Sequence, residues 1–419
     1  MITFDQTFIP MKRIFRHITL SHFLTFTLSL SLSLPIIIGT GFTAKADYWT
    51  QKADYGGGLV TNAIGFSLAN TAYIGLGIDY LANYRDDFWE YDQAANTWTQ
   101  KANFTGSMRQ GATAFAIGST GYIGLGWTPG YADDFWKYEP SSNTWTQLIN
   151  FGGTARDFAS AFTINGKGYF TCGLDNAGPA SDLWEYDAVL NSWTQKASLS
   201  TGVFAAVSYA VNNKGYVAAG FGNLNNSEYD PVANSWTLKA PFPFLLVGAA
   251  GFGIGNYGYV GTGIINLTTN TATKQFWQYN PALDLWTQKT DFGGAERTGA
   301  VGFTIGGNGY IGTGNSPSGF YQDFWEYTPD PIGISDLGFP ISDFTVYPNP
   351  ADDELTVTSK QFGENSEIKI IDADGRFCFQ APNTKLPAQI DVSNYPNGIY
   401  FLQLKSKDGI ATGKVVVVH

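Results

Sequence analysis

Three arginines recur at one place in a repeated pattern, and their guanidinium groups are suited to binding an acidic ligand. Arg109, Arg156 and Arg297 each lie twelve residues before the glycine of a Gly-Tyr pair. Other repeats carry aliphatic residues at this place, namely Val60, Val203 and Leu246. Because a guanidinium binds a carboxylate through two parallel hydrogen bonds, we expect the arginines to hold an acidic ligand near a central channel. The alternative is that each arginine is tied to an Asp or Glu of a neighbouring repeat.

Segments of variable sequence carry a second set of candidate ligand-binding residues. These segments span residues 78–87, 127–134, 265–275 and 315–323. Their aromatic residues include Tyr80, Tyr84, Trp127, Tyr131, Phe320 and Tyr321. Exposed aromatic rings stack on sugar rings or anchor protein partners, so we expect these residues to bind a glycan or a protein. The alternative is that the rings pack within their own loops.

Metal, redox and nucleophilic chemistry need side chains that the repeat region lacks. Residues 47–331 contain no histidine, since the histidines of the chain are His17, His22 and His419. A copper site of His ligands and a Ser-His-Asp triad are therefore excluded there. Cys172 and Cys378 lie far apart in apolar runs, which favours buried thiols over a disulfide. We expect no cofactor and no metal, and a binding module rather than an enzyme.

Recurring carboxylates are interpreted as structural. Glutamates recur within the phrase Trp-Glu-Tyr at Glu90, Glu185 and Glu326, and no isolated pair suggests a glycosidase. Aspartates recur just before this phrase at Asp86, Asp87, Asp133, Asp134, Asp182 and Asp323. Recurrence at one place indicates hydrogen bonding at the start of a strand rather than calcium binding.

These residues are positioned by six repeats of nearly fifty residues. The tryptophan of one phrase recurs at Trp49, Trp98, Trp145, Trp193, Trp236 and Trp286. The tryptophan of a second phrase recurs at Trp89, Trp136, Trp184, Trp277 and Trp325, and Ser227 holds the equivalent place in the fourth repeat. Self-similarity at such a period is typical of solenoids and propellers.

Each repeat predicts four short antiparallel strands. A loop leads to an alternating strand such as "FASAFTI", a Gly-rich strand such as "GYIGLG", a variable loop, "DFWEY", a tight turn and "TWTQK". The composition, with 16% aromatic and 14% charged residues and 49 glycines, also favours an all-β chain. A radial array of sheets buries both faces of each, so we expect a six-bladed β-propeller. The loops between repeats and the variable loops then share one face.

One repeat is divided between the two ends of the region. The segment Tyr48–Lys52, "YWTQK", has no preceding partner strands, whereas the sixth repeat ends at "DFWEY", residues Asp323–Tyr327. We therefore expect the N-terminal strand to complete the last sheet and to close the ring, since an open edge would promote aggregation.

The repeats resemble kelch repeats, the family of propellers that includes galactose oxidase. The matching residues run through Tyr122, Gly124, Gly126, Tyr138 and Trp145. The adjacent Gly-Gly of the family is here Gly-x-Gly or, in the third repeat, Cys-Gly, so the chain is a divergent member. The resemblance implies a kelch-type propeller over residues 47–331. It also implies an alternative function, that of the six-bladed sugar mutarotases that act on sialic acid.

Residues 1–46 have the pattern of a secretory signal peptide. Lys12, Arg13 and Arg16 precede an apolar run that ends at a small-x-small site, which predicts cleavage after Ala46. An uncleaved membrane anchor is the alternative. The remaining chain has 20 basic and 34 acidic residues, a net charge of −14, and should repel nucleic acid. We expect a secreted monomer.

The last part of the chain predicts a linker, residues 332–342, and a small Ig-like β-sandwich, residues 343–419. This tail is similar to the C-terminal sorting domains of type IX secretion cargo. The matching blocks are "YPNPADDELTV" (residues 347–357), "IKIIDADGR" (368–376), "IDVSNYPNGIYFLQL" (390–404) and "GKVVVV". The resemblance implies binding to the type IX machinery and a location on the outer-membrane surface or outside the cell. An accessory carbohydrate-binding sandwich is the alternative.

Overall fold

A computed structural model describes residues 47–329, 344–359, 366–372, 377–406 and 409–419. All regular secondary structure in these ranges is β-strand, which confirms the predicted all-β class. Within the same ranges there is no helix long and apolar enough to cross a membrane. The predicted signal peptide with its cleavage site at Ala46 and the predicted linker lie outside the described residues.

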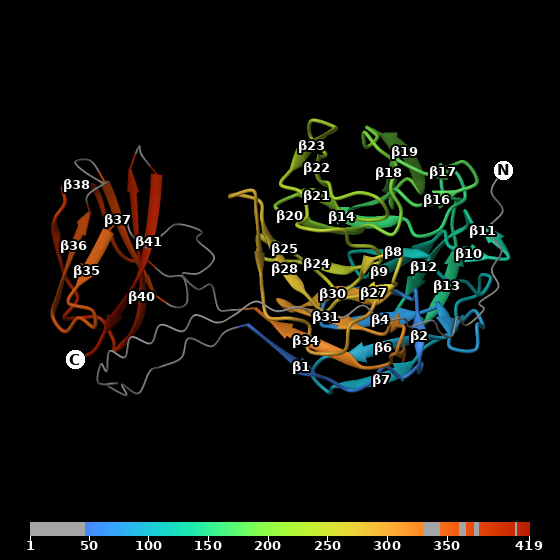
Figure 1. Ribbon diagram of the computed structural model, residues 1–419, viewed down its shortest axis with the longest axis horizontal. Coiled ribbons are helices and arrows are strands. Elements are labelled where there is room, and N and C mark those ends of the chain that lie inside the picture. The colour runs from blue at the N-terminus through green and yellow to red at the C-terminus, as the bar shows by residue number, and fades with distance from the viewer. Residues whose placement is uncertain (1–46, 330–343, 360–365, 373–376, 407–408) are drawn as a thin grey trace, which may run out of the picture. The chain divides into compact units, whose positions relative to one another are not determined.

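Residues 47–329 form six four-stranded antiparallel sheets, numbered here in chain order (Figure 1). Sheet 1 consists of β3 (Ile64–Leu68), β4 (Thr71–Gly75), β6 (Phe88–Asp92) and β7 (Thr97–Gln100). Sheet 2 consists of β8 (Thr113–Ile117), β9 (Thr120–Gly124), β12 (Phe135–Glu139) and β13 (Thr144–Gln147). Sheet 3 consists of β14 (Ser160–Ile164), β15 (Lys167–Thr171), β18 (Leu183–Asp187) and β19 (Ser192–Lys196).

The remaining three sheets repeat this order. Sheet 4 consists of β20 (Val207–Val211), β21 (Lys214–Ala218), β22 (Asn226–Asp230) and β23 (Ser235–Lys239). Sheet 5 consists of β24 (Ala250–Ile254), β25 (Tyr257–Gly261), β28 (Phe276–Asn280) and β29 (Leu285–Gln288). Sheet 6 consists of β30 (Val301–Ile305), β31 (Asn308–Gly312), β34 (Phe324–Thr328) and β1 (Tyr48–Gln51).

The first strands of the six sheets stand side by side in a closed ring. Each contacts the first strand of the sheet before and after it, and β30 contacts β3. Together they enclose an axial channel, defined here by the small residues that line it: 63–65, 112–114, 159–161, 206–208, 249–251 and 300–302. This part of the channel holds a cavity of about 170 Å³. The arrangement is consistent with the predicted propeller.

Neighbouring sheets interlock through an aromatic ring and a glycine. Phe115 of sheet 2 lies against Gly168 of sheet 3, where an added Cβ would come within 2.1 Å of the ring. The same contact joins Phe162 to Gly215 and Phe252 to Gly309. A glycine in the "GY" phrase therefore provides the space for the preceding sheet's aromatic side chain.

The predicted pairing of the divided phrase is present. Strand β1 pairs with β34, with Trp49 opposite Tyr327 and Gln51 opposite Trp325. Trp49 packs against Phe276 and Phe292, each at 5.0 Å between ring centroids. Sheet 6 is thus built from strands that lie about 280 residues apart in the sequence.

Asp47, the residue before β1, accepts the same kinds of hydrogen bond as an asparagine in the internal turn of sheet 1. In sheet 1 the turn residue Asn96 has a left-handed φ of 52°, and its Oδ1 accepts hydrogen bonds from the Tyr91 hydroxyl and from the backbone N–H of Ala53. Asp47 lies two residues before Trp49, as Asn96 lies two residues before Trp98. Its Oδ2 accepts from the Tyr327 hydroxyl at 2.7 Å and from the backbone N–H of Thr290 at 3.0 Å.

The C-terminal region forms two antiparallel sheets around one apolar core. One sheet has β35 (Phe344–Tyr347), β36 (Glu354–Ser359) and β39 (Ala388–Asp391). The other has β37 (Ser366–Asp372), β38 (Phe377–Thr384), β40 (Gly398–Ser406) and β41 (Gly409–Val417). Both contribute to the core, for example through Leu355 and Val357 from the first and Ile368, Ile370 and Leu402 from the second.

Cys172 is a buried thiol as predicted, whereas Cys378 is exposed, so the prediction for Cys378 is wrong.

Candidate functional site

One face of the six-sheet region carries both the loops between sheets and the variable loops, as predicted. Backbone bridges join the two kinds of loop directly. Gln110 pairs with Trp127, Asp157 with Leu174, and Thr298 with Asn315. We call this surface the loop face. It holds all the residues that the sequence nominated for ligand binding.

The variable loops of the loop face differ in structure. Short hairpins stand on four sheets: β10 (Trp127–Thr128) with β11 (Gly130–Tyr131), β16 (Leu174–Asp175) with β17 (Gly178–Pro179), β26 (Ile264–Asn266) with β27 (Thr271–Ala272), and β32 (Asn315–Ser316) with β33 (Gly319–Phe320). On sheet 1, β5 (Ile78–Asp79) pairs instead with β2 (Val60–Thr61). The corresponding segment of sheet 4, residues 219–225, contains no strand.

A closed circle of backbone hydrogen bonds joins the six sheets at the loop-face end of the axial channel. One residue of each sheet donates its N–H to the equivalent residue of the preceding sheet, at 2.9–3.1 Å: Asn62, Gly111, Phe158, Ala205, Gly248 and Gly299. All six residues have a left-handed φ, between 47° and 64°. The six N–H groups therefore already have acceptors within this circle.

The three arginines are buried and already bound. Their exposed fractions are 1%, 1% and 0% for Arg109, Arg156 and Arg297. Arg109 binds both oxygens of Asp134, and its Nη2 lies 2.7 Å from Oδ2. Arg156 binds Asp182 and Arg297 binds Asp323 in the same way.

Each guanidinium also donates hydrogen bonds to backbone carbonyls. The Nε–H of Arg109 donates to the carbonyl of Ser107 at 2.9 Å, and its Nη1 donates to the carbonyl of Leu125 at 3.0 Å. Equivalent bonds hold Arg156 and Arg297. Arg109 and Arg297 thus use four of their five N–H groups within their own sheets, and Arg156 uses all five, because its Nη2 also donates to the Thr154 hydroxyl. This agrees with the alternative considered from the sequence, in which each arginine is tied to an acidic residue. The acid, however, belongs to the same sheet rather than to a neighbouring one.

Each arginine is the centre of a repeated four-residue group, which we call the Arg-Asp-Trp-Phe cluster. In sheet 2 the Trp136 indole N–H donates to Asp134 at 2.7 Å, and the Arg109 guanidinium lies 5.1 Å from the centroid of Phe104. Burial raises the pKa of Asp134, but hydrogen bonds and charge from Arg109 outweigh burial and lower the pKa overall. Asp182 has a lowered pKa for the same reasons. Four of the recurring aspartates, Asp87, Asp134, Asp182 and Asp323, thus accept from an arginine and an indole, whereas Asp86 and Asp133 accept from asparagine side chains.

The recurring glutamates are also bound within the sheets. The Tyr73 hydroxyl donates to Glu90, Tyr169 to Glu185 and Tyr310 to Glu326. Lysines of the adjoining outer strand complete these groups, with Lys52 Nζ 3.2 Å from Glu326 and Lys101 Nζ 3.3 Å from Glu90. These contacts agree with the structural interpretation of the Trp-Glu-Tyr phrase.

Some of the nominated aromatic residues pack on other side chains, and others lie apart on separate sheets. Trp127 and Tyr131 are half-buried on the β10–β11 hairpin and pack edge-to-face, with ring centroids 4.8 Å apart. Tyr321 packs within its own sheet, since its ring lies 4.3 Å from the Arg297 guanidinium and its hydroxyl lies 2.7 Å from Ser316 Oγ. Tyr84 and Phe320 are half-buried on separate sheets, so the six-sheet ring distributes the candidates around its face rather than gathering them.

Sequence reasoning missed Asp157, the residue that follows Arg156. It is 6% exposed, and its Oδ1 is buried without a hydrogen-bond partner. Burial raises the pKa of Asp157 to about 7. The equivalent residues of the other sheets are Thr61, Gln110, Phe204, Val247 and Thr298. Alignment of the repeats would have identified a single acid at a place where no other repeat has one.

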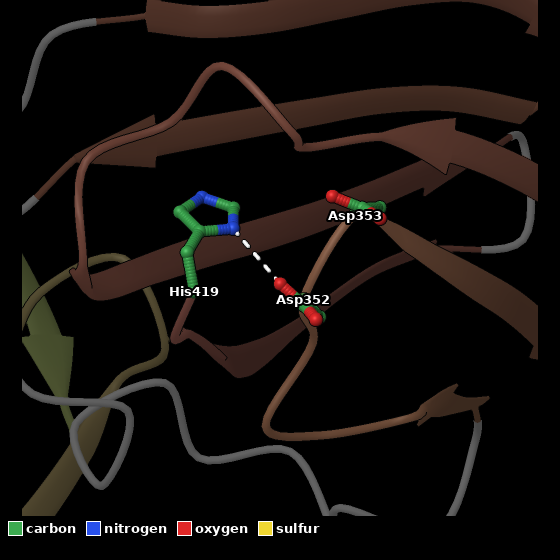
Figure 2. Close-up of side chains that lie close together, drawn as sticks. All are labelled: Asp352, Asp353 and His419. Atoms are coloured by element: carbon green, nitrogen blue, oxygen red, sulfur yellow. Dashed lines mark hydrogen bonds and ion pairs between the residues drawn. The ribbon is translucent and has the colours of Figure 1, made fainter.

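Only one group of three potential metal ligands lies close together within the described ranges, and it is in the C-terminal region (Figure 2). It comprises Asp352, Asp353 and His419, all exposed. The His419 Nδ1 lies 3.1 Å from Asp352 Oδ1, and Nε2 lies 2.8 Å from the carbonyl oxygen of Tyr395. Acceptors at both ring nitrogens, the Tyr395 carbonyl first and then Asp352, raise the pKa of His419. The group is thus suited to an ion pair with a protonated imidazole.

Comparison with known proteins identifies the C-terminal region and gives a likeness for the rest. A search of curated protein sequences finds no match. Among solved structures, one titled "Structure of YjhT" matches with a TM-score of 0.57 and 18% identity, over 65% of this chain and 95% of that chain. At this identity the likeness concerns the fold alone. Residues 345–418 match the family model "Secretion system C-terminal sorting domain". Such domains mark proteins for type IX secretion, and this chain is therefore exported to the cell surface or the extracellular space.

Proposed function

We propose that the protein is an exported six-bladed kelch-type β-propeller that binds a glycan through its loop face. The Trp127–Tyr131 pair carries this proposal. Both rings are half-exposed on a short hairpin next to the mouth of the axial channel, with centroids 4.8 Å apart. Rigid aromatic side chains of this kind offer apolar area to the C–H face of a sugar while their polar edges remain available for hydrogen bonds.

The domain organisation that we propose follows from the sequence pattern. Residues 1–46 are a signal peptide removed after Ala46, residues 47–331 are the propeller, residues 332–342 are a linker and residues 343–419 are an Ig-like sorting domain. Support for the six-bladed kelch type comes from six four-stranded sheets in one ring and from the Gly-x-Gly phrase in four of the six repeats. Asp47, the first residue after the proposed cleavage site, takes part in closing sheet 6.

The alternative of an enzyme acting on an acidic sugar has less support. It required free guanidiniums from Arg109, Arg156 and Arg297, and these side chains are buried in ion pairs with aspartates. We propose that the three arginines stabilise the sheets. The remaining arginine of residues 47–329, Arg85, is paired with Asp79 and Asp87.

A protein ligand is the second candidate, favoured by an apolar patch over sheet 4. Phe204 and Phe221 stack with centroids 4.8 Å apart, and Phe221 is 46% exposed. Leu224, 42% exposed, lies in the same short segment. Exposed apolar side chains that lie together favour interaction sites. Because no hairpin covers sheet 4, this patch is accessible to a folded partner.

A glycan array probed with the full exported protein tests the proposal. We expect binding to a subset of glycans, and loss of that binding in Trp127→Ala with unchanged thermal stability. Phe221→Ser serves as the matched variant, because it alters the loop face outside the aromatic pair. Glycan binding that Phe221→Ser abolishes and Trp127→Ala leaves intact would assign the ligand to sheet 4. Absence of binding to every glycan would contradict the glycan proposal.

A further inference from the structure

Asp157 is a buried residue of the loop face whose Oδ1 has no hydrogen-bond partner, and an aromatic pair lies on the neighbouring sheet. Its backbone pairs with Leu174 of β16, with N–O distances of 3.0 and 2.8 Å in the two directions. On its other side lies sheet 2, since a Cβ built on Gly111 would be 3.5 Å from the Cβ of Asp157. Gly111 belongs to the backbone circle at the channel mouth. Asp157 is thus fixed at the junction of sheets 2 and 3, on the rim of that mouth.

The carboxyl group of Asp157 lies within electrostatic reach of the β10–β11 hairpin. Tyr131 has a raised pKa, caused first by burial and then by the charges of Asp157 and Asp175. Thr61 is the equivalent residue of sheet 1. Its hydroxyl donates to the side chain of Asn315, on the preceding sheet 6, at 2.8 Å. Asn315 is the structural counterpart of Trp127. In sheet 1 this position has a polar partner in the protein, whereas Asp157 Oδ1 has none.

An unsatisfied buried carboxyl oxygen requires an explanation, because burial removes its hydrogen bonds to water and no protein donor replaces them. We infer that Asp157, Trp127 and Tyr131 form a subsite for a neutral sugar residue, with a sugar hydroxyl donating to Asp157 and the sugar's C–H face packing on the aromatic pair. This inference rests on the proposed glycan-binding function and specifies the class of sugar. It also predicts a neutral ligand, whereas the three arginines had suggested an acidic one.

The charges around the subsite favour a neutral ligand over an acidic one. Asp175 accepts a hydrogen bond from Thr154 Oγ1 at 2.6 Å, and its charge acts on Tyr131. The adjacent cation, Arg156, is directed into its own ion pair with Asp182. A uronic acid or sialic acid would therefore bring a negative charge toward Asp157 and Asp175 without a free cation to receive it.

The ionisation of Asp157 also suits a hydroxyl ligand. With a pKa of about 7, the group can accept a hydrogen bond as a carboxylate or donate one as an acid, and a sugar hydroxyl can take either part. Tyr131 is a neighbouring titratable group whose charge interacts with that of Asp157, and it stays neutral near pH 7 because its pKa lies above the ordinary tyrosine value of 10.

Titration calorimetry on the full exported protein, with three pairs of sugars, tests the inference. The pairs are glucose with glucuronic acid, galactose with galacturonic acid, and N-acetylglucosamine with N-acetylneuraminic acid. We expect the neutral member of at least one pair to bind at least tenfold more tightly than the acidic member. Asp157→Asn and Trp127→Ala should each weaken that binding at least tenfold. The matched control, Val189→Ala in the exposed turn between β18 and β19, should leave it unchanged.

Other outcomes separate failure of the inference from failure of the proposed function. If glycans bind but Asp157→Asn has the affinity of the native protein, the subsite is elsewhere and glycan binding stands. Tighter binding of an acidic sugar, or of glucosamine through its ammonium group, would overturn the neutral class. If none of these sugars and no arrayed glycan binds, the proposed function itself is overturned. The isosteric Asn keeps the test independent of folding, and thermal melts of each variant verify it.

Discussion

At the scale of residues, each buried arginine of the six-sheet region is accompanied by an aspartate, and the two change together. Sheets 2, 3 and 6 have the full Arg-Asp-Trp-Phe cluster. Sheet 4 replaces all four members at once, with Val203, Asn225, Ser227 and Leu199. Sheet 5 has Leu246 and the uncharged Gln275, and sheet 1 has Val60 but keeps Asp87, which pairs with Arg85 at 2.8 Å. A buried charge without a partner is strongly destabilising, which explains the coupling.

This coupling predicts the behaviour of a double variant in sheet 3. Arg156→Leu should lower the free energy of unfolding by about 3 kcal/mol, because it leaves Asp182 buried without its cation. Arg156→Leu combined with Asp182→Gln, which reproduces sheet 5, should recover most of that loss. Urea unfolding of the two variants and of Asp182→Gln alone measures the coupling. Additive losses in the double variant would contradict the charge-balance interpretation.

Asp157 predicts a dependence of stability on pH. Its pKa of about 7 in the folded protein lies above the ordinary value of 3.8, so between these values the folded state retains a proton that the unfolded state releases. The contribution of this group to stability therefore falls as the pH rises from about 4 to 7 and is level above that. Asp157→Asn should raise the free energy of unfolding by about 2 kcal/mol at pH 8, less than the full pKa difference because water screens part of the carboxylate.

The control for this prediction is the same pair of proteins at pH 4, where both Asp157 in the folded state and its Asn replacement are neutral. There the two melting curves should nearly coincide. An equal gain at pH 4 and pH 8 would mean that packing, and not ionisation, explains the effect.

At the scale of elements, closure of the ring depends on β1. The strand supplies four backbone pairs to β34 and the Trp49 ring to the interface with sheet 5. Asp47 adds acceptors for Tyr327 and Thr290, the part that an Asn takes in the turn of sheet 1. Sheet 6 without β1 would expose the edge of β34, and exposed edges promote aggregation.

Deletion of residues 47–52 should therefore yield aggregated or molten protein, as seen by size-exclusion chromatography and near-UV circular dichroism. A milder test is Asp47→Ala, which should cost about 1–2 kcal/mol because the buried Tyr327 hydroxyl and the Thr290 N–H lose their acceptor. Thr50→Ala is the matched control, since Thr50 is an exposed residue of the same strand. Recovery of a soluble deletion variant with native thermal stability would contradict the closure.

At the scale of the whole molecule, the chain combines a ligand-binding candidate with a sorting domain that directs export. Deletion of residues 343–419 should leave the remainder of the protein inside the cell envelope, with loss of the surface signal in protease-accessibility and fractionation assays. Trp127→Ala, which leaves the sorting domain unaltered, should be exported normally and serves as the control. Normal surface levels of the deletion variant would contradict the assignment of export to this domain.

The sequence alone determined the repeat, the strand order, the shared loop face and the pairing of β1 with the last sheet. These follow from local periodicity and from a phrase repeated six times, and local patterns survive without knowledge of distant contacts. It also identified the sorting domain, because the matching blocks are contiguous. The burial of Cys172 was predicted correctly, and the exposure of Cys378 was not.

Only the tertiary structure decided which candidate side chains are available to a ligand. Arg109 and Asp134 lie 25 residues apart, and the fold alone brings them into an ion pair that consumes the guanidinium. Conversely, alignment of the repeats marks Asp157 only as an unusual acid, and its isolation results from burial between two sheets whose residues come from separate repeats. Hydrogen-bond satisfaction is a property of three-dimensional neighbours. For this reason the sequence could nominate chemical groups, while the fold determined that the arginines are occupied and that an acid is left without a partner.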